Sequence, residues 1–246
     1  HTVPFFNPDN NKFEKRLLVA NDVFSLYEWV DHMLSVSSNG AASVVWKELI
    51  LIQEFGKDYI DLTEEEAEVY FKQTSKKELS DISIQVVNDP LRELGIGENE
   101  WRLGTMFTRG ASNVIPPQGG SIATPKGMTK WIWQLEHGQI VDEKSSLEIK
   151  KLLYMTDRRI RYAANSKLNN AAVYFKSGSL YKCKEEEGYA CGKYLGNVYN
   201  YMNSVAIVEH SNGVKYSVVL MTNVLKKNSN SDHNQLAGRI DGILNP

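Results

Sequence analysis

The stretch that decides the fold is "AAVYFKSGSLYKC", residues 171–183. It reads as a β-strand, and it opens the part of the chain in which the hydrophobic pattern changes to a period of two. Lys176, Ser177, Gly178 and Ser179 interrupt this strand at its centre with three polar side chains and a glycine. A strand that packs one face against a core has no structural need for such an interruption. These four residues are therefore candidates for a functional site.

The sequence downstream of this strand predicts an antiparallel sheet. Two strand-like runs flank Asn212-Gly213, and an Asn-Gly pair in that position is the strongest short-range signal of a β-hairpin. The segment "DHNQLAGRIDGIL", residues 232–244, has the pattern of a helix. Residues 166–246 are thus predicted to form three antiparallel strands followed by a C-terminal helix.

Residues 21–165 are predicted to be mainly helical. Apolar side chains recur at helical spacing between Val23 and Leu34. Residues 40–56, "GAASVVWKELILIQEFG", are apolar nearly all round, as expected of a buried helix. A short polar break, "SVSSNG" at residues 35–40, joins these two helices. The fold class is therefore α+β, with a helical block, an antiparallel sheet and a final helix.

Two more helices of this block begin with the spacing of a capping box. Thr63 stands three residues before Glu66, and Ser75 stands three residues before Glu78. Pro90 is expected to end or kink the second of these helices, because proline lacks the N–H that an interior helical position requires.

Two segments have no regular pattern. Residues 1–20 are rich in Asn and Pro, then charged, and are predicted as an irregular lead-in. Residues 95–127 hold seven Gly and three Pro, and a loop of this length is either functional or disordered. Its embedded apolar side chains, such as Trp101, favour a packed loop. A helix follows, with Thr124 as its cap and Pro125 at its first position.

The bulk composition excludes several classes of function. The 246 residues carry a net charge of −2, so no basic excess points to nucleic acid. No apolar run approaches the roughly 18 residues that a transmembrane helix needs. The five histidines are scattered without metal-ligand spacing, and no phosphate-binding or dinucleotide-binding glycine motif is present. We therefore expect no metal, no cofactor and no nucleic-acid partner.

The two cysteines, Cys183 and Cys191, flank the segment "KEEEGYA". This spacing suits a small loop closed by a disulfide, which would fit an oxidising compartment. Two free thiols in a reducing compartment are the alternative.

Two short motifs, in this order, resemble the serine β-lactamase and penicillin-binding protein superfamily, in its class A-like branch. Members of that superfamily carry S-x-x-K, S-D-N and K-T-G elements. "SSNGAAS" matches the second element, with Ser37 and Asn39 in place and Ser38 at the aspartate position. "KSGS" matches the third, with Lys176 and Gly178 identical and a serine for the threonine. The resemblance runs from about residue 22 to the end and includes the Thr-Pro helix.

The resemblance implies acyl transfer on D-Ala-D-Ala-type peptides, β-lactams or related amides and esters. By it, Ser37 would relay a proton to the leaving nitrogen, and Lys176 would act electrostatically and fix that relay. Asn39 would hold the amide side chain of the substrate. Ser177 would bind its carboxylate, and the N–H of Ser179 would donate in the oxyanion hole. Each residue also has a structural alternative: helix capping for Ser37 and Asn39, a solvated strand face for Lys176, and a β-bulge for Gly178.

The first element of the superfamily is absent from its expected place. The one S-x-x-K match in the chain, Ser179 to Lys182, lies in the strand, where residues i and i+3 point to opposite faces. Ser43 and Lys47 share a helical face, but their spacing is wrong and their helix follows the second motif. The N-terminal strands of the superfamily are missing as well.

These gaps, and a chain that begins with His, predict one β-lactamase-like domain that is incomplete at its N-terminus. The nucleophile would lie on a missing N-terminal segment. The alternative is a non-catalytic binding or scaffold module of the same fold. An S-x-x-K upstream of residue 1 would favour the enzyme.

The loop at residues 95–127 also departs from the class A lactamases, which use a loop glutamate to activate water. Glu98 and Glu100 are its only acids, and their context does not match that loop. Slow hydrolysis of an acyl-enzyme is the expected result, so a penicillin-binding or peptidase-like enzyme is favoured over an efficient lactamase. The resemblance also implies secretion or a place in the bacterial cell envelope.

Overall fold

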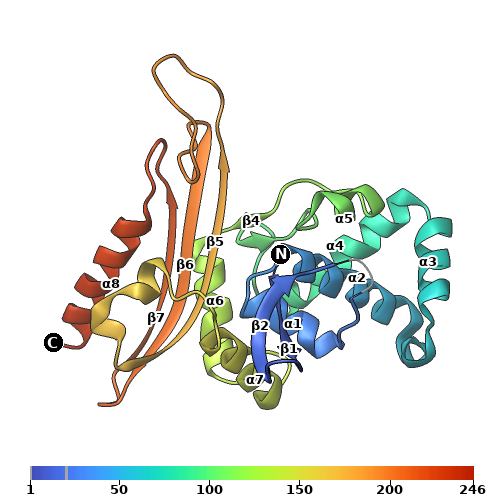
Figure 1. Ribbon diagram of the computed structural model, residues 1–246, viewed down its shortest axis with the longest axis horizontal. Helices are drawn as coiled ribbons and strands as arrows, with labels where there is room; N and C mark the ends of the chain where they lie inside the picture. The colour runs from blue at the N-terminus through green and yellow to red at the C-terminus, as the bar shows by residue number, and fades with distance from the viewer. Residues whose placement is uncertain (1, 20–21) are drawn as a thin grey trace. The chain divides into compact units, whose positions relative to one another are not determined.

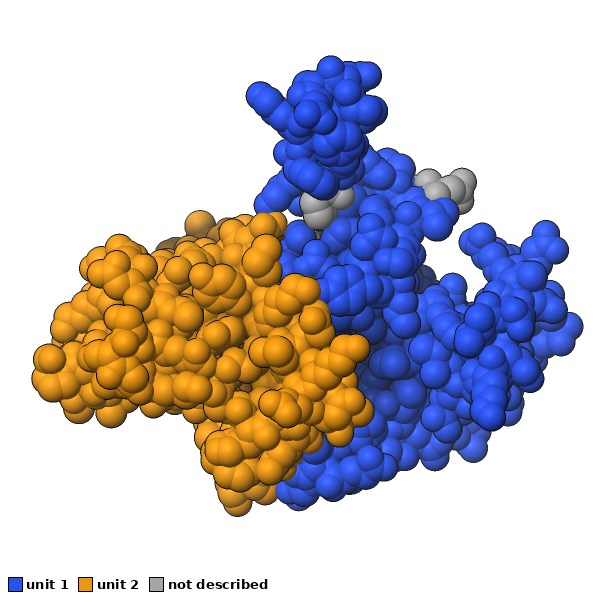
Figure 2. Space-filling view, turned by 90° about the horizontal axis from the view of Figure 1, so that it is seen from below, with its two compact units in different colours: residues 1–123 blue, residues 124–246 orange. Residues whose placement is uncertain are grey.

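The computed structural model describes residues 2–19 and 22–246, and it separates into two compact units, residues 1–123 and 124–246 (Figure 2, blue and orange). The change from helices to strands, predicted at residue 165, falls between a helix that ends at Tyr154 and a strand that begins at Ala171. The division between the units lies earlier, because the two helices after residue 124 pack on the sheet.

The first unit is mainly helical (Figure 1). Its elements are β1 (Thr2–Asn7), β2 (Lys12–Leu17), α1 (Leu26–Leu34), α2 (Asn39–Phe55), a 3₁₀ helix (Gly56–Asp61), α3 (Glu64–Gln73), α4 (Lys76–Glu93), β3 (Trp101–Arg102), α5 (Arg109–Val114) and β4 (Ile122–Ala123).

The start of the chain corrects the prediction of an irregular lead-in. Its described part is an antiparallel hairpin of β1 and β2, with Thr2 opposite Leu17 and Asn7 opposite Lys12. The Asn-rich composition that indicated irregular structure belongs to the turn of this hairpin, where Asn11 adopts a positive φ of 54°.

The helix boundaries of the first unit follow the capping signals, and of the two outcomes expected at Pro90, an end or a kink, an end at the proline itself is not observed. Thr63 and Glu66 form the predicted capping box, and the Ser75 side chain accepts a hydrogen bond from the Glu78 N–H. Helix α4 does not end at Pro90 but continues to Glu93. The proline lies in the last turn, where its own carbonyl still accepts from the Leu94 N–H at 3.1 Å.

The core of the first unit joins α2 and α4 to the glycine-rich loop. The Trp46 indole N–H donates to the Ser83 carbonyl at 2.9 Å, which fixes α2 against α4. Met106 and Ile115 from the loop are buried in the same cluster as Trp46 and Ile50. The loop is therefore packed, as its apolar side chains predicted.

The second unit holds the main sheet (Figure 1). Its elements are α6 (Pro125–Glu136), α7 (Glu143–Tyr154), two 3₁₀ turns (Arg161–Ala164 and Ser166–Leu168), β5 (Ala171–Lys182), β6 (Tyr199–His210), β7 (Lys215–Asn223) and α8 (Asn230–Leu244). The sheet is antiparallel in the order β5-β6-β7, and β6 and β7 form the hairpin predicted at Asn212-Gly213. The α+β class is confirmed.

Helices cover both faces of this sheet, with α8 on one side and α6 and α7 on the other (Figure 1). Val173 and Phe175 from β5 lie on the α8 side and are buried with Tyr162 and Ala237. Tyr174, one residue along, points to the other side, where its ring contacts that of Tyr154 in α7. The first half of β5 is thus fixed on both faces.

No helix in the described part of the chain, residues 2–19 and 22–246, combines the length and the apolar character that crossing a membrane requires.

Candidate active site

The Lys176–Ser179 stretch lies where β5 leaves the core. β5 is an edge strand, paired only with β6 among the described residues, and its residues are exposed from Gly178 to Lys182. Consecutive strand residues alternate in direction, so Lys176 shares the α6 and α7 face with Tyr174. Ser177 and Ser179 point to the α8 face. The side chains therefore do not share one face of the sheet. The four residues share the exposed backbone edge of β5.

Lys176 is a largely buried lysine in a positive environment. Its Nζ donates to the carbonyl of Ser177 at 2.8 Å. Burial, together with the nearby positive charges of Arg158 and Arg161, lowers the pKa of Lys176 from 10.5 to about 8. An ammonium with this pKa can hold or release a proton near neutral pH, which suits electrostatic and proton-transfer roles.

Arg161 is a functional candidate that the sequence did not reveal. It is 3% exposed, and its Nη1 donates to the carbonyls of Gly178 at 2.8 Å and Asn203 at 3.1 Å. These two residues face each other in the β5–β6 register, so one guanidinium holds both strands at the motif. Arg161 is one of three arginines in "DRRIRY", residues 157–162, and no feature of the sequence distinguishes it from the other two. Its role becomes visible only from its contacts in the folded structure.

A buried polar group supports the motif from the α8 side. Ser204, opposite Ser177 in the register, lies 2.9 Å from the Nδ1 of His233, and Thr222 lies 3.2 Å from its Nε2. Because Thr222 donates its hydroxyl hydrogen to the Met202 carbonyl, it accepts from Nε2–H, and Ser204 donates to Nδ1. Burial lowers the pKa of His233 and keeps it neutral. This fully buried histidine fastens α8 to the strands.

The S-x-x-K match in the strand is rejected by the geometry, as predicted. Ser179 and Lys182 both belong to the extended strand β5 and point to opposite faces of the sheet.

The second motif lies in the first unit, in the break between α1 and α2. Ser38, not Ser37 or Asn39, caps α2, since its side chain accepts from the Ala41 N–H. Ser37 has a positive φ of 60°, and the next N–H, that of Ser38, bonds the His32 carbonyl at 3.0 Å. Asn39 is the first residue of α2 and is exposed.

The predicted site residues therefore fall into two groups. Ser37 and Asn39 belong to the first unit, and the Lys176–Ser179 stretch belongs to the second. The local conformation of each group is determined by contacts within its own unit.

The loop acids are both engaged within their own loop. Glu98 forms an ion pair with Arg102 at 3.2 Å, and the Glu100 carboxylate accepts from the Gly97 N–H at 2.9 Å. Their contacts serve the loop conformation.

The tip of the β5–β6 connection contains a disulfide between Cys183 and Cys191. Neighbouring contacts brace this tip: the Tyr189 hydroxyl donates to the Leu195 carbonyl at 2.7 Å, and Glu186 pairs with Lys226 at 2.7 Å. In Figure 1 the connection extends past the end of α8.

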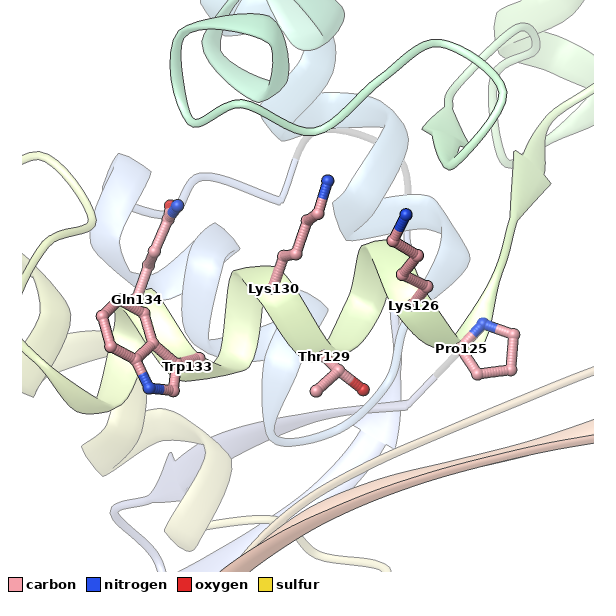
Figure 3. A pocket seen from close by; sticks show the side chains of 6 residues that line it. All are labelled: Pro125, Lys126, Thr129, Lys130, Trp133 and Gln134. Atoms are coloured by element: carbon pink, nitrogen blue, oxygen red, sulfur yellow. The ribbon is translucent and has the colours of Figure 1, made fainter.

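A shallow pocket of about 480 Å³ lies along α6 (Figure 3). It is lined by Pro125, Lys126, Thr129, Lys130, Trp133 and Gln134. Trp133 is half exposed and stacks on His137, with ring centroids 4.1 Å apart. Within the described residues, no group of three or more His, Cys, Asp or Glu side chains is arranged to hold a metal ion.

The comparisons with known proteins agree with this fold. A model of the beta-lactamase enzyme family matches residues 16–243, which is nearly the whole chain. The chain therefore belongs to the beta-lactamase enzyme family. No curated protein matches it.

Solved structures show the same fold at low sequence identity. A class A beta-lactamase representative from Bacteroides cellulosilyticus is 15% identical, with a TM-score of 0.58 over 96% of this chain and 65% of that chain. A beta-lactamase from Sphaerobacter thermophilus is 16% identical, with a TM-score of 0.55 over 91% of this chain and 65% of that chain. PBP-A is 13% identical, with a TM-score of 0.54 over 98% of this chain and 69% of that chain. The chain thus spans about two thirds of the length of these proteins.

Proposed function

We propose that this chain is the major part of a serine hydrolase that transfers acyl groups from D-Ala-D-Ala-type peptides, β-lactams or related amides and esters. The observation that carries the proposal is the edge strand with its Lys-Ser-Gly-Ser stretch, clamped by the buried Arg161. An exposed edge offers backbone groups to which an extended substrate can add as a further strand. The family membership supports the same reaction class.

Within this proposal each residue has a distinct role. Lys176 stabilises developing negative charge and supports proton transfer through Ser37. Ser177 binds the substrate carboxylate, and the N–H of Ser179 donates to the oxyanion. Gly178 keeps the edge flat, since only Asn203 lies near the position of its absent side chain. Asn39 holds the amide of the substrate side chain.

The nucleophile of this reaction lies outside the segment, in our proposal. Two observations support this. The chain spans 65% of the B. cellulosilyticus protein, and β7 pairs only with β6 among the described residues, which leaves its outer edge for further strands. The missing segment would supply both the strands and the S-x-x-K serine.

The proposed enzyme releases its acyl group slowly. The carboxylates of Glu98 and Glu100 are occupied within the loop, which favours a penicillin-binding or peptidase-like activity over a fast lactamase. Fast turnover of a chromogenic cephalosporin by the intact protein would contradict this.

We place the protein in the cell envelope or outside the cell. The disulfide and the family support this placement, since disulfides persist in oxidising compartments. Fractionation of the native host, with thiol alkylation before lysis, tests it: the proposal requires recovery in the exported fraction with both cysteines protected.

The decisive experiment is covalent labelling with a fluorescent penicillin. The intact protein should be labelled and the 246-residue chain alone should not. In the intact protein, Lys176→Ala should slow labelling by about 10²-fold. Lys182→Ala, an exposed lysine on the same strand, should not change it. Labelling of the 246-residue chain alone would show that the nucleophile is inside this segment.

The second candidate is a non-catalytic binding or scaffold module, favoured by the absence of an S-x-x-K at a helix start in this chain. It predicts no covalent labelling of the intact protein, and saturable binding of a D-Ala-D-Ala peptide that Ser177→Ala weakens.

A further inference from the structure

A basic cavity of about 630 Å³ lies within the first unit, where α2, α3 and the start of α4 meet the end of α5. This volume is typical of pockets for small molecules. The residues that define its chemistry are Lys47, Glu68, Phe71, Lys72, Lys76 and Val114. None of them belongs to the site described above.

The charges around this cavity do not balance. Three lysines line it, against one carboxylate, and that carboxylate, Glu68, is paired with Lys72 at 2.6 Å. Lys76 donates to two backbone carbonyls of the α5 end, those of Asn113 and Val114, which orient the ammonium without neutralising its charge.

Lys47 is the third cation of the cavity, and its one ion pair among the described residues is long, at 4.0 Å. Its Nζ lies 4.0 Å from the Glu48 carboxylate, which also accepts from the Tyr59 hydroxyl at 2.9 Å, and its charge helps the nearer Lys72 to lower the pKa of Glu68. Its ammonium lies over the ring of Phe71, 5.6 Å from the centroid. The cavity therefore places two weakly compensated ammonium groups beside apolar surface.

That apolar surface is formed by Phe71, which is half-buried, and Val114, which is 43% exposed. An anion with an apolar part can satisfy both features at once. A nucleic acid or another polyanion fits less well, because the chain carries a net charge of −2 and the positive groups gather in one concave site.

We propose that this cavity binds a small organic anion. Lys47 and Lys76 hold its phosphate, carboxylate or sulfonate group, and Phe71 and Val114 contact its apolar part. This site is independent of the proposed acyl-transfer cleft, so each can fail without the other.

The test is a titration of the ¹⁵N-labelled protein with phenyl phosphate, followed by NMR. Saturable shifts are expected at amides of residues 71–76 and at Val114. Inorganic phosphate and phenol, which each carry one half of the probe, should bind at least about threefold more weakly. Equal binding of phenol and phenyl phosphate would overturn the role of the lysines.

Matched variants locate the anion. Lys47→Ala should weaken phenyl phosphate about threefold, and Lys47→Ala with Lys76→Ala roughly tenfold, as expected for exposed charge pairs. Lys47→Arg should retain binding. Lys77→Ala removes the same charge from the same helix as Lys76, at a side chain 89% exposed and outside the cavity, and should change nothing. Equal loss in Lys47→Ala and Lys77→Ala, or no saturable shifts at all, would overturn the site.

Discussion

Ser37 adopts a backbone conformation, with φ at 60°, that glycine takes without cost and a serine does not. The helix cap at this point is supplied by Ser38. A hydroxyl at residue 37 is therefore not needed to begin α2, and its presence in a strained position is consistent with a chemical role.

Ser37→Gly separates the structural role from the chemical one. The substitution keeps the positive φ and removes the hydroxyl, so the free energy of unfolding should change by less than about 1 kcal/mol. Acylation of the intact protein by a penicillin should slow by about 10²-fold, the scale of a lost proton relay. Unfolding in urea and labelling rates measure the two effects. A variant that is destabilised but labels normally would assign Ser37 to structure alone.

Lys176 sets a pH limit on the proposed reaction. Its pKa of about 8 means that the ammonium loses its charge as the pH rises through that value, so the acylation rate should fall above pH 8. Between about pH 8 and 10.5 the unfolded lysine still binds the proton that the folded one has lost. The contribution of this group to stability therefore rises with pH in that interval.

Arg158→Gln tests the origin of this limit. Arg158 is exposed, and its charge lowers the pKa of Lys176, so its removal should move the alkaline limb of the rate profile to higher pH. Measuring the labelling rate from pH 6 to pH 10 gives the pH at which the rate falls on the alkaline side. An unchanged limb would show that Lys176 does not govern it.

Arg161 should matter for both stability and activity. Arg161→Lys removes the guanidinium Nη1 that donates to both the Gly178 and Asn203 carbonyls, and a buried acceptor left without its donor costs about 1–3 kcal/mol. Arg158→Lys, at an exposed position nearby, should change the free energy of unfolding by less than about 0.5 kcal/mol. Equal effects of the two substitutions in urea unfolding would refute the clamp.

At the scale of elements, an ion-pair network ties the helices of the second unit to its sheet. Lys150 of α7 pairs with Glu136 of α6 at 2.8 Å and with Glu209 of β6 at 2.9 Å, and Lys215 of β7 pairs with both carboxylates. Burial alone raises the pKa of Glu136 and of Glu209, but the lysines outweigh it and hold both pKa values below the ordinary range.

Lys150→Met should destabilise the protein by about 1–3 kcal/mol at pH 7, because two partly buried carboxylates lose the more buried of the two lysines that they share. Carboxylates with lowered pKa values stabilise the fold above their unfolded pKa, so the cost should shrink as the pH falls through the folded values. Lys151→Met, on the exposed side of the same helix, should cost less than about 0.5 kcal/mol. Urea unfolding at pH 7 and pH 3 gives both comparisons.

At the scale of the whole molecule, local signals in the sequence predict single elements, whereas the grouping of elements into units depends on contacts between distant residues. The Asn212-Gly213 hairpin and the Thr63 cap carry local signals, so they were predictable from a few neighbouring residues. The assignment of α6 and α7 to the sheet unit depends on contacts such as Lys150 with Glu209, which are distant in sequence. The hydrogen bonds from Arg161 to the Gly178 and Asn203 carbonyls also join residues that are distant in sequence, so no spacing of residues predicts them.

The N-terminal hairpin shows the opposite limit. Its strands are short, so the Asn-rich composition of the turn between them determined the prediction of irregular structure for residues 1–20. The pairing of Phe6 with Phe13, with ring centroids 5.3 Å apart, becomes visible only once the register is known. A two-strand ribbon of this size is weakly specified by its own sequence.

The disulfide at the tip of the β5–β6 connection has a consequence for how the chain responds to proteases. A single cut between Cys183 and Cys191 would leave two fragments joined by one sulfur–sulfur bond. The nicked protein would migrate as one band in a denaturing gel and as two after treatment with a thiol reductant. Such a nick would sever the connection beyond the Lys-Ser-Gly-Ser strand while keeping that strand covalently attached to β6 through the cystine.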